Sequence, residues 1–530
     1  MLQLLLGGSG SGKTTLLYQR IRARAEKGEK SILLVPEQFT SSTEGRIYRE
    51  LGDALSGMVE SFSFTSLAEK ILSTEGGAAV QTLSDAGRAV LVRRALEELQ
   101  DNVHYYHRHR RSAAFCQMAA QTIDELKSAG LSGQQLAQLA GACGAESGKL
   151  SELALIFQGY ETLLARSGMD PSDRLELAGA RLEEALARHS LPEFLRDRAV
   201  FIDEFDTFNA PKKRLLGAML AALPSVTVAL CDDGAPLLPG DLSLFSGAKQ
   251  VAAQLRQLAR KNGAEVAVPQ LLRKDLRHRN APGLAAVAEL LETGSCTADA
   301  PAGEVRLFAA PSREEEARAA AGAIRRLMRQ GVRCGKIAVV CRDIAKYRAA
   351  VRYEFRMAEI PLYCDEPTTP EFSAPATAVR ALLEIARGAD LTENLTTLAK
   401  TGLCALSEEQ VCALENYAYT WAPTAAAWRE KFERSPKGFG EQELTEEDLR
   451  NRERAEHARA LLVGAVDAFR AKVRGGNAEA ISRAVYFCLK TLGAEEQQAA
   501  QVKAIRAGRG IPAAEEAARE WNVVMGLLNE

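Results

Sequence analysis

Two hydrophobic patterns alternate along the chain. Short apolar runs, typical of buried parallel strands, lie at residues 4–6 and within residues 31–40, 198–208 and 225–233, and segments with helical periodicity separate them. From residue 85 to about residue 189 the helical pattern is almost uninterrupted. Because strands that alternate with helices form parallel sheets, this pattern predicts an α/β domain whose sheet is interrupted by a helical insertion.

A second α/β unit is predicted from about residue 303. Strand-like runs at 304–312 and 336–343 flank a helical segment and precede a third run at 360–367, and the chain after residue 376 is helical again. A sheet that begins without return strands indicates the front portion of a longer protein. The predicted domains are a discontinuous phosphate-loop domain (residues 1–84 and 196–300), a helical insertion (85–195), a partial second sheet domain (301–385) and a helical region (386–530).

Composition narrows the functional classes. The 530 residues carry 67 Lys and Arg against 69 Asp and Glu, so the net charge of -2 gives no global sign of a nucleic-acid-binding protein, and any DNA contact must come from local basic segments. No apolar stretch approaches the roughly 18 residues that span a bilayer, so we expect a cytoplasmic protein without membrane contact. The ten cysteines form no CxxC pair, which favours reduced, buried thiols over a metal site.

The most specific motif lies near the N-terminus, in the stretch LLLGGSGSGKTTLL at residues 4–17. Its glycine and lysine spacing, between a strand and a helix, matches a phosphate-binding loop whose backbone N–H groups surround an anion at a helix N-terminus. Lys13 is expected to reach the terminal phosphates and the Thr14 hydroxyl to bind Mg²⁺. The predicted nucleotide-binding residues are Gly7, Gly8, Ser9, Gly10, Ser11, Gly12, Lys13, Thr14 and Thr15.

A working phosphate loop also needs a carboxylate at the end of a nearby strand. The run AVFIDEF supplies Asp203 and Glu204 directly after four apolar residues. We expect Asp203 to hold the Mg²⁺ shell together with Thr14, and Glu204 to polarise the attacking water as a general base. The expected cofactors are therefore ATP and Mg²⁺.

Five segments together resemble one protein family. LLLGGSGSGKTTLL, LLVPEQFTSSTE, VESFSFTSLAEKIL, VFIDEFDTF and KIAVVCRDIAKYRAAVRYEFRMAEIPLYCDE recur in this order in the B subunit of the AddAB/RexAB helicase-nuclease. The resemblance implies a superfamily 1 helicase-like P-loop domain with helical insertions and a partial second RecA-like domain. It also implies resection of DNA double-strand breaks for recombinational repair, on single strands and duplex ends, as a heterodimer with a motor and nuclease partner of the AddA/RexA type.

The same resemblance limits the expected activity. The family's nuclease domain and its 4Fe-4S cluster lie at the C-terminal end of the full-length protein, so we expect neither in this chain. Active superfamily 1 helicases carry GDxxQ where this chain has Cys231 to Ala235, and only Arg277 or Arg279 loosely match the next motif. The family often has Gly where Glu204 stands. We therefore expect ATP binding with weak turnover at most, while the partner protein supplies the motor.

The resemblance also points to DNA contacts and to reading of a recombination hotspot (Chi). Gln38 and Thr40 can hydrogen-bond base edges, and Phe64 offers a stacking face, whereas Phe62 is expected in the core. Ser66 and Glu69 stand where hotspot readers tend to have a basic and an aromatic residue, so the hotspot differs or reading has been lost. The most basic segment, HYYHRHRRSAAF, adds Arg108, Arg110 and Arg111 as expected phosphate contacts, although a solvated loop explains it nearly as well.

Two other functions remain open from the sequence. The chain could be an autonomous DNA-dependent ATPase or helicase, or a P-loop NTPase or kinase unrelated to DNA. A kinase is expected to have a compact fold with an arginine-rich lid, which the long helical insertion and the second sheet domain disfavour.

Overall fold

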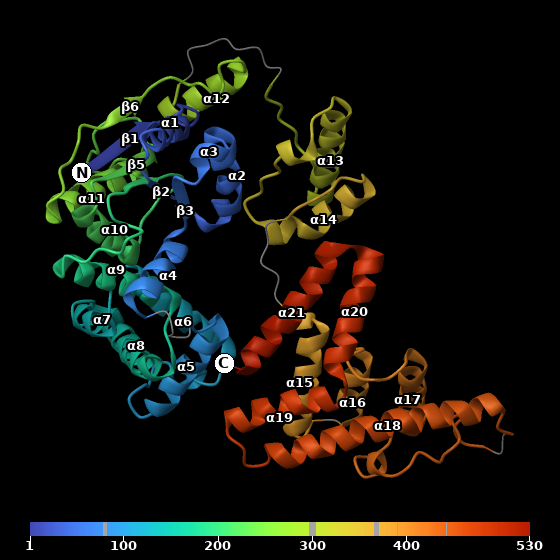
Figure 1. Ribbon diagram of the computed structural model, residues 1–530. Helices are drawn as coiled ribbons and strands as arrows, with labels where there is room; N and C mark the ends of the chain where they lie inside the picture. The colour runs from blue at the N-terminus through green and yellow to red at the C-terminus, as the bar shows by residue number, and fades with distance from the viewer. Residues whose placement is uncertain (78–81, 296–303, 365–369, 390, 441–442, 530) are drawn as a thin grey trace. The chain divides into compact units, whose positions relative to one another are not determined.

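A computed structural model describes residues 1–530 except 78–81, 296–303, 365–369, 390, 441–442 and 530. The chain divides into two compact units, Met1–Phe308 and Ala309–Glu530. Each unit has its own hydrophobic cores, and each is described separately below (Figure 1).

The first unit is built on a six-stranded parallel sheet. Its strands, in chain order, are β1 (Leu2–Gly7), β2 (Ser31–Leu34), β3 (Val59–Phe62), β4 (Ala199–Ile202), β5 (Ser225–Cys231) and β6 (Gln270–Leu272). In space the order is β3-β2-β4-β5-β1-β6, so one strand, β5, separates β1 from β4. The sequence predicted the first five strands, but not the short edge strand β6.

Successive apolar side chains along each strand point to opposite faces, so both faces of the sheet are apolar, as is typical of a buried parallel sheet. Leu5 and Leu33 pack on one face against the helices α1 (Lys13–Ala25) and α2 (Thr40–Leu51). Leu4 and Leu6 point to the opposite face, whose core includes side chains from four further helices. These are α4 (Phe64–Glu75), α9 (Pro171–Ala187), α10 (Ala210–Ala222) and α11 (Ser246–Lys261). The short helix α3 (Asp53–Ser56) connects α2 to β3.

A separate helical core follows α4 in the chain. It is formed by α5 (Asp85–Glu98), α6 (Ala113–Ser128), α7 (Gly133–Ala140) and α8 (Ser147–Ser167). The next helix, α9, places Leu175, Ala178 and Leu182 in the core of the sheet rather than in this helical core. The last helix of the unit, α12 (Pro282–Thr293), follows β6.

The second unit differs from its predicted strand pattern. Its first helices, α13 (Arg313–Arg329) and α14 (Ile344–Met357), pack together around Ile324 and Phe355. The predicted strands at 304–312 and 336–343 are not strands in the structure, and neither are the described residues 360–364 of the third run. A strand needs a hydrogen-bonded neighbour, and these apolar segments have none among the described residues: Leu307 is fully exposed and Val340 is 90% exposed.

The remainder of the second unit is helical, as predicted. A single core, centred on the buried Trp428 and Phe469, joins most of its helices. The helices are α15 (Ala374–Ala386), α16 (Leu391–Lys400), α17 (Glu408–Trp421), α18 (Glu446–Val473), α19 (Ala478–Thr491), α20 (Ala494–Arg509) and α21 (Ile511–Asn529). Short 3-10 turns lie at Glu37–Phe39, His107–His109, Gly144–Glu146, Cys334–Lys336, Pro370–Phe372 and Ala427–Arg429.

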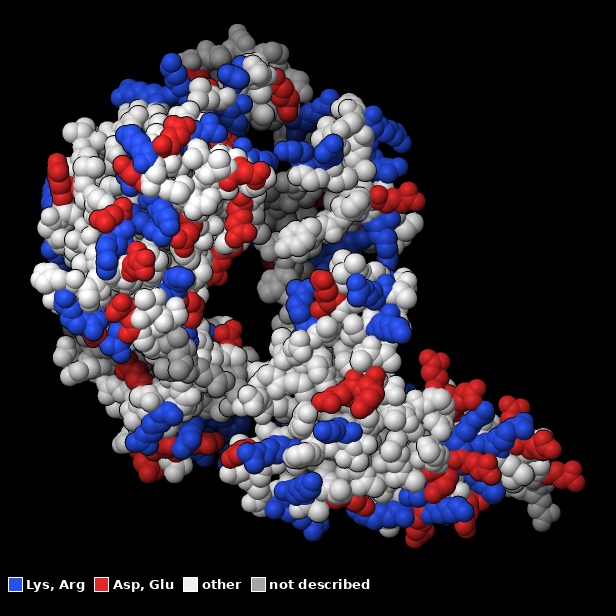
Figure 2. Space-filling model, viewed as in Figure 1, with Lys and Arg blue, Asp and Glu red and all other residues white. Residues whose placement is uncertain are grey.

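Charged side chains of both signs occur together on one face of the molecule (Figure 2). Figure 2 shows Lys and Arg interspersed with Asp and Glu on the visible face, in agreement with the nearly balanced composition. None of the helices among the described residues is long and apolar enough to cross a lipid bilayer.

A buried ion cluster attaches the helical core to α9. The Lys127 ammonium of α6 lies 2.7 Å from an Asp170 carboxylate oxygen and 2.8 Å from one of Asp173. The Tyr160 hydroxyl of α8 donates to the other oxygen of Asp170 at 2.5 Å. Both Tyr160 and Asp170 are almost fully buried, so each partner in the cluster depends on the others to compensate its lost hydration.

We predict that Lys127→Met destabilises the chain by about 3–5 kcal/mol, because it leaves the buried Asp170 carboxylate without its counter-charge. Urea unfolding followed by circular dichroism measures this loss. The matched control is Lys149→Met, which removes the exposed contacts of Lys149 with Glu146 and with the Tyr105 ring and should leave the unfolding midpoint nearly unchanged. Equal effects of the two substitutions would contradict the assignment.

Candidate nucleotide-binding site

The predicted phosphate loop connects β1 to α1. β1 ends at Gly7, the loop turns through Gly10 and Gly12, and α1 begins at Lys13. Gly10 and Gly12 have φ angles of 78° and 90°, in the left-handed region that glycine adopts without strain. All nine predicted nucleotide-binding residues thus lie in this loop and in the first turn of α1, where the helix N-terminus favours an anion.

Neighbouring segments also restrict two positions of the loop to glycine. A methyl group added at Gly7 would lie 2.6 Å from the Leu272 carbonyl oxygen, and one added at Gly10 would lie 2.6 Å from the Arg277 Cβ atom. These contacts come from the end of β6 and the segment after it, far away in the sequence. Long-range packing therefore adds a second reason for glycine at these positions.

Two polar side chains of the loop are arranged for an anionic ligand. The Lys13 ammonium donates to the carbonyl oxygens of Gly7 and Gly8, at 2.7 and 2.8 Å, and burial lowers the pKa of Lys13. The Ser11 hydroxyl is buried and has no hydrogen-bond partner among the described residues. A buried hydroxyl without a partner is costly, and phosphate oxygens are suitable acceptors for it.

The acid at the end of β4 lies beside the start of α1. Asp203 is buried, and its carboxylate accepts a hydrogen bond from the backbone N–H of Glu204 at 3.1 Å. Burial raises the pKa of Asp203, while hydrogen bonds from the Thr14 hydroxyl and from Glu204 oppose this rise. The structure thus brings Thr14 and Asp203 together, although 189 positions separate them in the sequence.

A cavity of about 560 Å³ opens at this pair. Thr14, Asp203 and Glu204 line it together with Tyr18 and Arg46. The Arg46 guanidinium lies 4.9 Å from the centre of the Tyr18 ring, and its charge acts on both acids. Arg46 was not singled out from the sequence, because a single arginine within an amphipathic helix carries no local signal.

Glu204 has an unusual backbone. Its φ angle of 64° places a non-glycine residue in the left-handed region, which costs about 1–3 kcal/mol and is found most often at functional sites. Burial and the charge of Asp203 raise the pKa of the Glu204 carboxyl, so it is more basic than an ordinary glutamate. A more basic carboxylate suits a general base.

The donor set suits Mg²⁺ bound through a nucleotide. Among the described residues, no group of three or more His, Cys, Asp or Glu could hold a metal ion by itself. Magnesium at phosphate loops needs fewer protein ligands, because the phosphates and waters complete its octahedron. Thr14 and Asp203 would hold the ion, and its charge would neutralise the phosphate oxygens.

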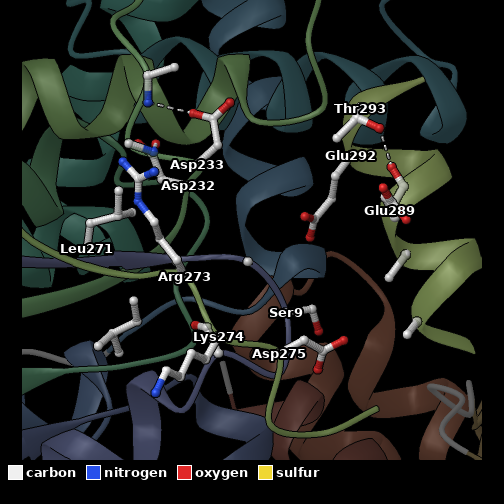
Figure 3. A pocket seen from close by; sticks show the side chains of 18 residues that line it. Ser9, Asp232, Asp233, Leu271, Arg273, Lys274, Asp275, Glu289, Glu292 and Thr293 are labelled. Carbon is white, nitrogen blue, oxygen red and sulfur yellow. Dashed lines mark hydrogen bonds between the residues drawn. The ribbon is translucent and has the colours of Figure 1, made fainter. Parts of the chain in front are cut away.

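A second cavity, of about 520 Å³, is lined by Gly7, Gly8, Ser9 and Ser11 of the loop (Figure 3). Its walls come from the loop, from the end of β5, from the segment after β6 and from α12. Carboxylates are prominent in it, including Asp233, Asp275 and Glu292. The residues that stand where active helicases carry GDxxQ lie at this cavity. The backbone N–H of Gly234 donates to the Asp232 carboxylate at 2.7 Å, which fixes the turn after β5.

The predicted DNA-contacting residues after β2 and β3 take different positions. Gln38 is exposed in the 3-10 turn, and the Thr40 hydroxyl donates to the Glu37 carbonyl oxygen at 2.9 Å. Phe64 is only 3% exposed, and its ring packs edge-on against Phe205 and Phe208. The expected stacking face of Phe64 is therefore covered in this structure, whereas Phe62, expected in the core, is half-buried.

The reason is a change of secondary structure between the two phenylalanines. β3 ends at Phe62, and α4 begins at Phe64 with the Ser63 hydroxyl as its N-cap. The strand that carries Phe62 therefore ends before Phe64. The helical position turns its ring inward.

A small cavity of about 290 Å³ lies at this place and includes two residues that the sequence analysis missed. Gln38, Phe205 and Lys212 line it, and Phe205 is half-buried. The Lys212 ammonium lies 5.6 Å from the ring centres of both Phe64 and Phe205. Phe205 directly follows the acid pair after β4, so the sequence could have identified it as a residue of the site. Nothing in the sequence around Lys212 identifies that residue.

The basic segment around residue 108 belongs to the helical core instead. Its backbone N–H groups at residues 104–106 donate to the Glu152 carboxylate. Arg108 and Arg111 are exposed, whereas one nitrogen of the Arg110 guanidinium lies 3.1 Å from the His107 ring. The structure thus holds these arginines on an ordered turn, apart from the sheet edge that carries the phosphate loop.

Comparison with known proteins agrees with this architecture. The family model described as ADDB, N-terminal, matches residues 4–288. Proteins named as the B subunit of an ATP-dependent helicase/deoxyribonuclease are similar along the chain: those of Desulforudis audaxviator and Moorella thermoacetica are each 30% identical over 100% of this chain and 47% of their own length. That of Symbiobacterium thermophilum is 31% identical over 81% of this chain and 38% of its own length.

The chain spans just under half the length of the first two relatives. The family model covers more than half of this chain, including the phosphate loop, the acid pair and residues of all six strands of the sheet. The chain therefore belongs to the AddB family.

Proposed function

We propose that this chain is the helicase-like part of the B subunit of a helicase-nuclease that resects DNA double-strand breaks, and that it holds ATP and single-stranded DNA. The observation that carries the proposal is the meeting of Lys13, Thr14 and Asp203 at one edge of the sheet. Ligands of open parallel sheets bind at the carboxyl ends of the strands. The names of the relatives, which include ATP-dependent helicase, support the same conclusion.

In this proposal each residue has a definite role. The loop N–H groups and Lys13 bind the phosphates, and Thr14 with Asp203 holds the Mg²⁺ that accompanies them. Glu204 would accept a proton from the attacking water. Turnover is slow, because the turn at 231–235 has no glutamine that could sense the terminal phosphate.

The proposed DNA contacts lie at the same sheet edge and on the helical core. The cavity lined by Gln38, Phe205 and Lys212 would hold a base, and Thr40, two residues after Gln38, would contact the same strand of DNA. Arg108, Arg110 and Arg111 would bind phosphates elsewhere on the strand. A motor and nuclease partner of the AddA/RexA type, bound as a heterodimer, would pull the DNA while this chain takes part in reading the hotspot.

We predict that Lys13→Ala weakens binding of Mg-ATP at least about tenfold, since it removes the ammonium that reaches the terminal phosphates. Titration of a fluorescent ATP analogue, with and without single-stranded DNA, measures this effect. Lys27→Ala, at the exposed end of α1, is the matched control and should bind like the wild type. Unchanged affinity of the Lys13 variant would refute the proposed site.

We predict that Glu204→Gln and Glu204→Gly both lower the residual ATP hydrolysis by about 10²-fold or more, because both lack the base. Only Glu204→Gly should also raise the free energy of unfolding, by about 1 kcal/mol, because the relief of left-handed strain exceeds the entropy that glycine adds to the unfolded chain. Single-turnover hydrolysis and urea unfolding of both variants separate the two effects. A glycine variant less stable than the glutamine variant would contradict the strain.

We predict that Phe205→Ala weakens binding of single-stranded DNA by about 1–3 kcal/mol, the usual contribution of one stacked base, whereas Phe205→Tyr retains it. Fluorescence anisotropy at a fixed salt concentration measures the affinities. Thermal unfolding of both variants controls for the contact of Phe205 with Phe64. If the alanine and tyrosine variants bind DNA equally well, Phe205 does not stack on a base.

A further inference from the structure

A segment from the end of the first unit lies against the phosphate loop. We call residues 273–293 the strap; it contains the turn after β6 and the whole of α12. The backbone N–H of Leu276 donates to the Gly10 carbonyl oxygen at 3.0 Å, and the Arg277 guanidinium donates to the Ser9 hydroxyl at 3.2 Å. The strap therefore touches the loop through both backbone and side chains.

The turn of the strap is rigid. The Asp275 carboxylate accepts hydrogen bonds from the backbone N–H groups of Arg277 and His278, at 3.1 and 3.0 Å, and lies 2.9 Å from the His278 ring nitrogen. These bonds hold Leu276 and Arg277 in place over the glycines of the loop. The turn thus fixes where α12 begins relative to the loop.

The far end of α12 brings a negative charge to the same loop. A methyl group added at Gly8 would lie 2.6 Å from a carboxylate oxygen of Glu292, so this carboxylate rests directly on the Gly8 backbone. Figure 3 shows the Glu292 side chain directed into the cavity beside Ser9. Glu292 also acts on the charge of Lys13, which is bonded to the Gly8 carbonyl oxygen.

We place the terminal phosphate of a bound nucleotide near this position, because the lysine of a phosphate loop reaches the outer phosphates and the Glu292 carboxylate acts on the charge of Lys13. A carboxylate next to a phosphate repels it, and the repulsion grows with the number of negative charges on the ligand. Glu292 therefore acts against a triphosphate more strongly than against a diphosphate.

α12 itself is held weakly. Among its residues only Gly283 is fully buried, and Leu291, next to Glu292, is 66% exposed. Elements with few buried contacts open at low free energy. The helix can thus move away from the loop without disturbing the sheet.

We propose that the strap is an autoinhibitory element, in which Glu292 competes with the terminal phosphate for Lys13 and makes the site favour ADP over ATP until α12 is displaced. The proposal rests on the proposed function, since it concerns the same nucleotide site. It assigns a regulatory role to a segment that the sequence analysis considered only for two loosely matching arginines.

The test compares ATP and ADP binding by the full chain in Mg²⁺ buffer. Glu292→Gln removes the charge while keeping the shape, and it should raise the affinity for a non-hydrolysable ATP analogue about tenfold and that for ADP less than about threefold. Glu289→Gln, one turn earlier on α12, is the matched control and should change neither affinity. Thermal unfolding shows whether each variant is folded.

Each outcome decides the proposal. Selective gain of ATP affinity in Glu292→Gln supports the strap, as does binding of ATP by this variant where the wild type binds none. An equal gain for both nucleotides, or no gain while the wild type binds nucleotide through Lys13, overturns the strap and leaves the proposed function intact. If neither protein binds nucleotide, both proposals fail.

Discussion

Val228, in the middle of β5, pairs with Ile202 of β4 on one side and with Leu4 of β1 on the other. Because of this register, β4 ends level with Leu4 while β1 continues to Gly7. Asp203, the acid that follows β4, is therefore close enough to the start of α1 to accept a hydrogen bond from the Thr14 hydroxyl. A shift of one residue in either pairing would turn apolar side chains to the wrong face of the sheet. The packing of the two cores thus fixes the geometry of the polar site.

The three residues that follow β4 are divided between two cavities. Asp203 and Glu204 line the cavity beside the phosphate loop, and Phe205 lines the smaller cavity between Gln38 and Lys212. The left-handed backbone of Glu204 lies between the two. Rotation about the backbone bonds of Glu204 would move the Asp203 and Phe205 side chains relative to each other, because these two residues are its neighbours in the chain. The proposed nucleotide and DNA sites therefore have a short covalent connection.

Local patterns predicted the elements better than their contacts. The strands β1 to β5, the helical insertion and the helices after residue 376 follow from apolar runs and periodicity, and the phosphate loop follows from its glycine spacing. Phe64, which the resemblance places among the DNA contacts, is buried because α4 begins there, directly after the Ser63 cap. The strap was missed because its contacts join residues more than 260 positions apart, as Arg277 and Ser9 are. The apolar segments near Leu307 and Val340 have strand-like sequences, but pairing partners decide whether a strand forms.

Those unpaired segments have a consequence for the behaviour of the chain in solution. Val305, Leu307, Phe308, Val339 and Val340 expose apolar side chains in segments that form neither helix nor strand among the described residues. Backbone of this kind is a template for intermolecular β pairing, the first step of aggregation. Arg306 interrupts the first segment, and Pro311 follows it, as charges and prolines do beside hydrophobic strands in natural sequences. Intermolecular β pairing of the chain is therefore expected to begin at these two exposed segments rather than at the cores that determine its folding.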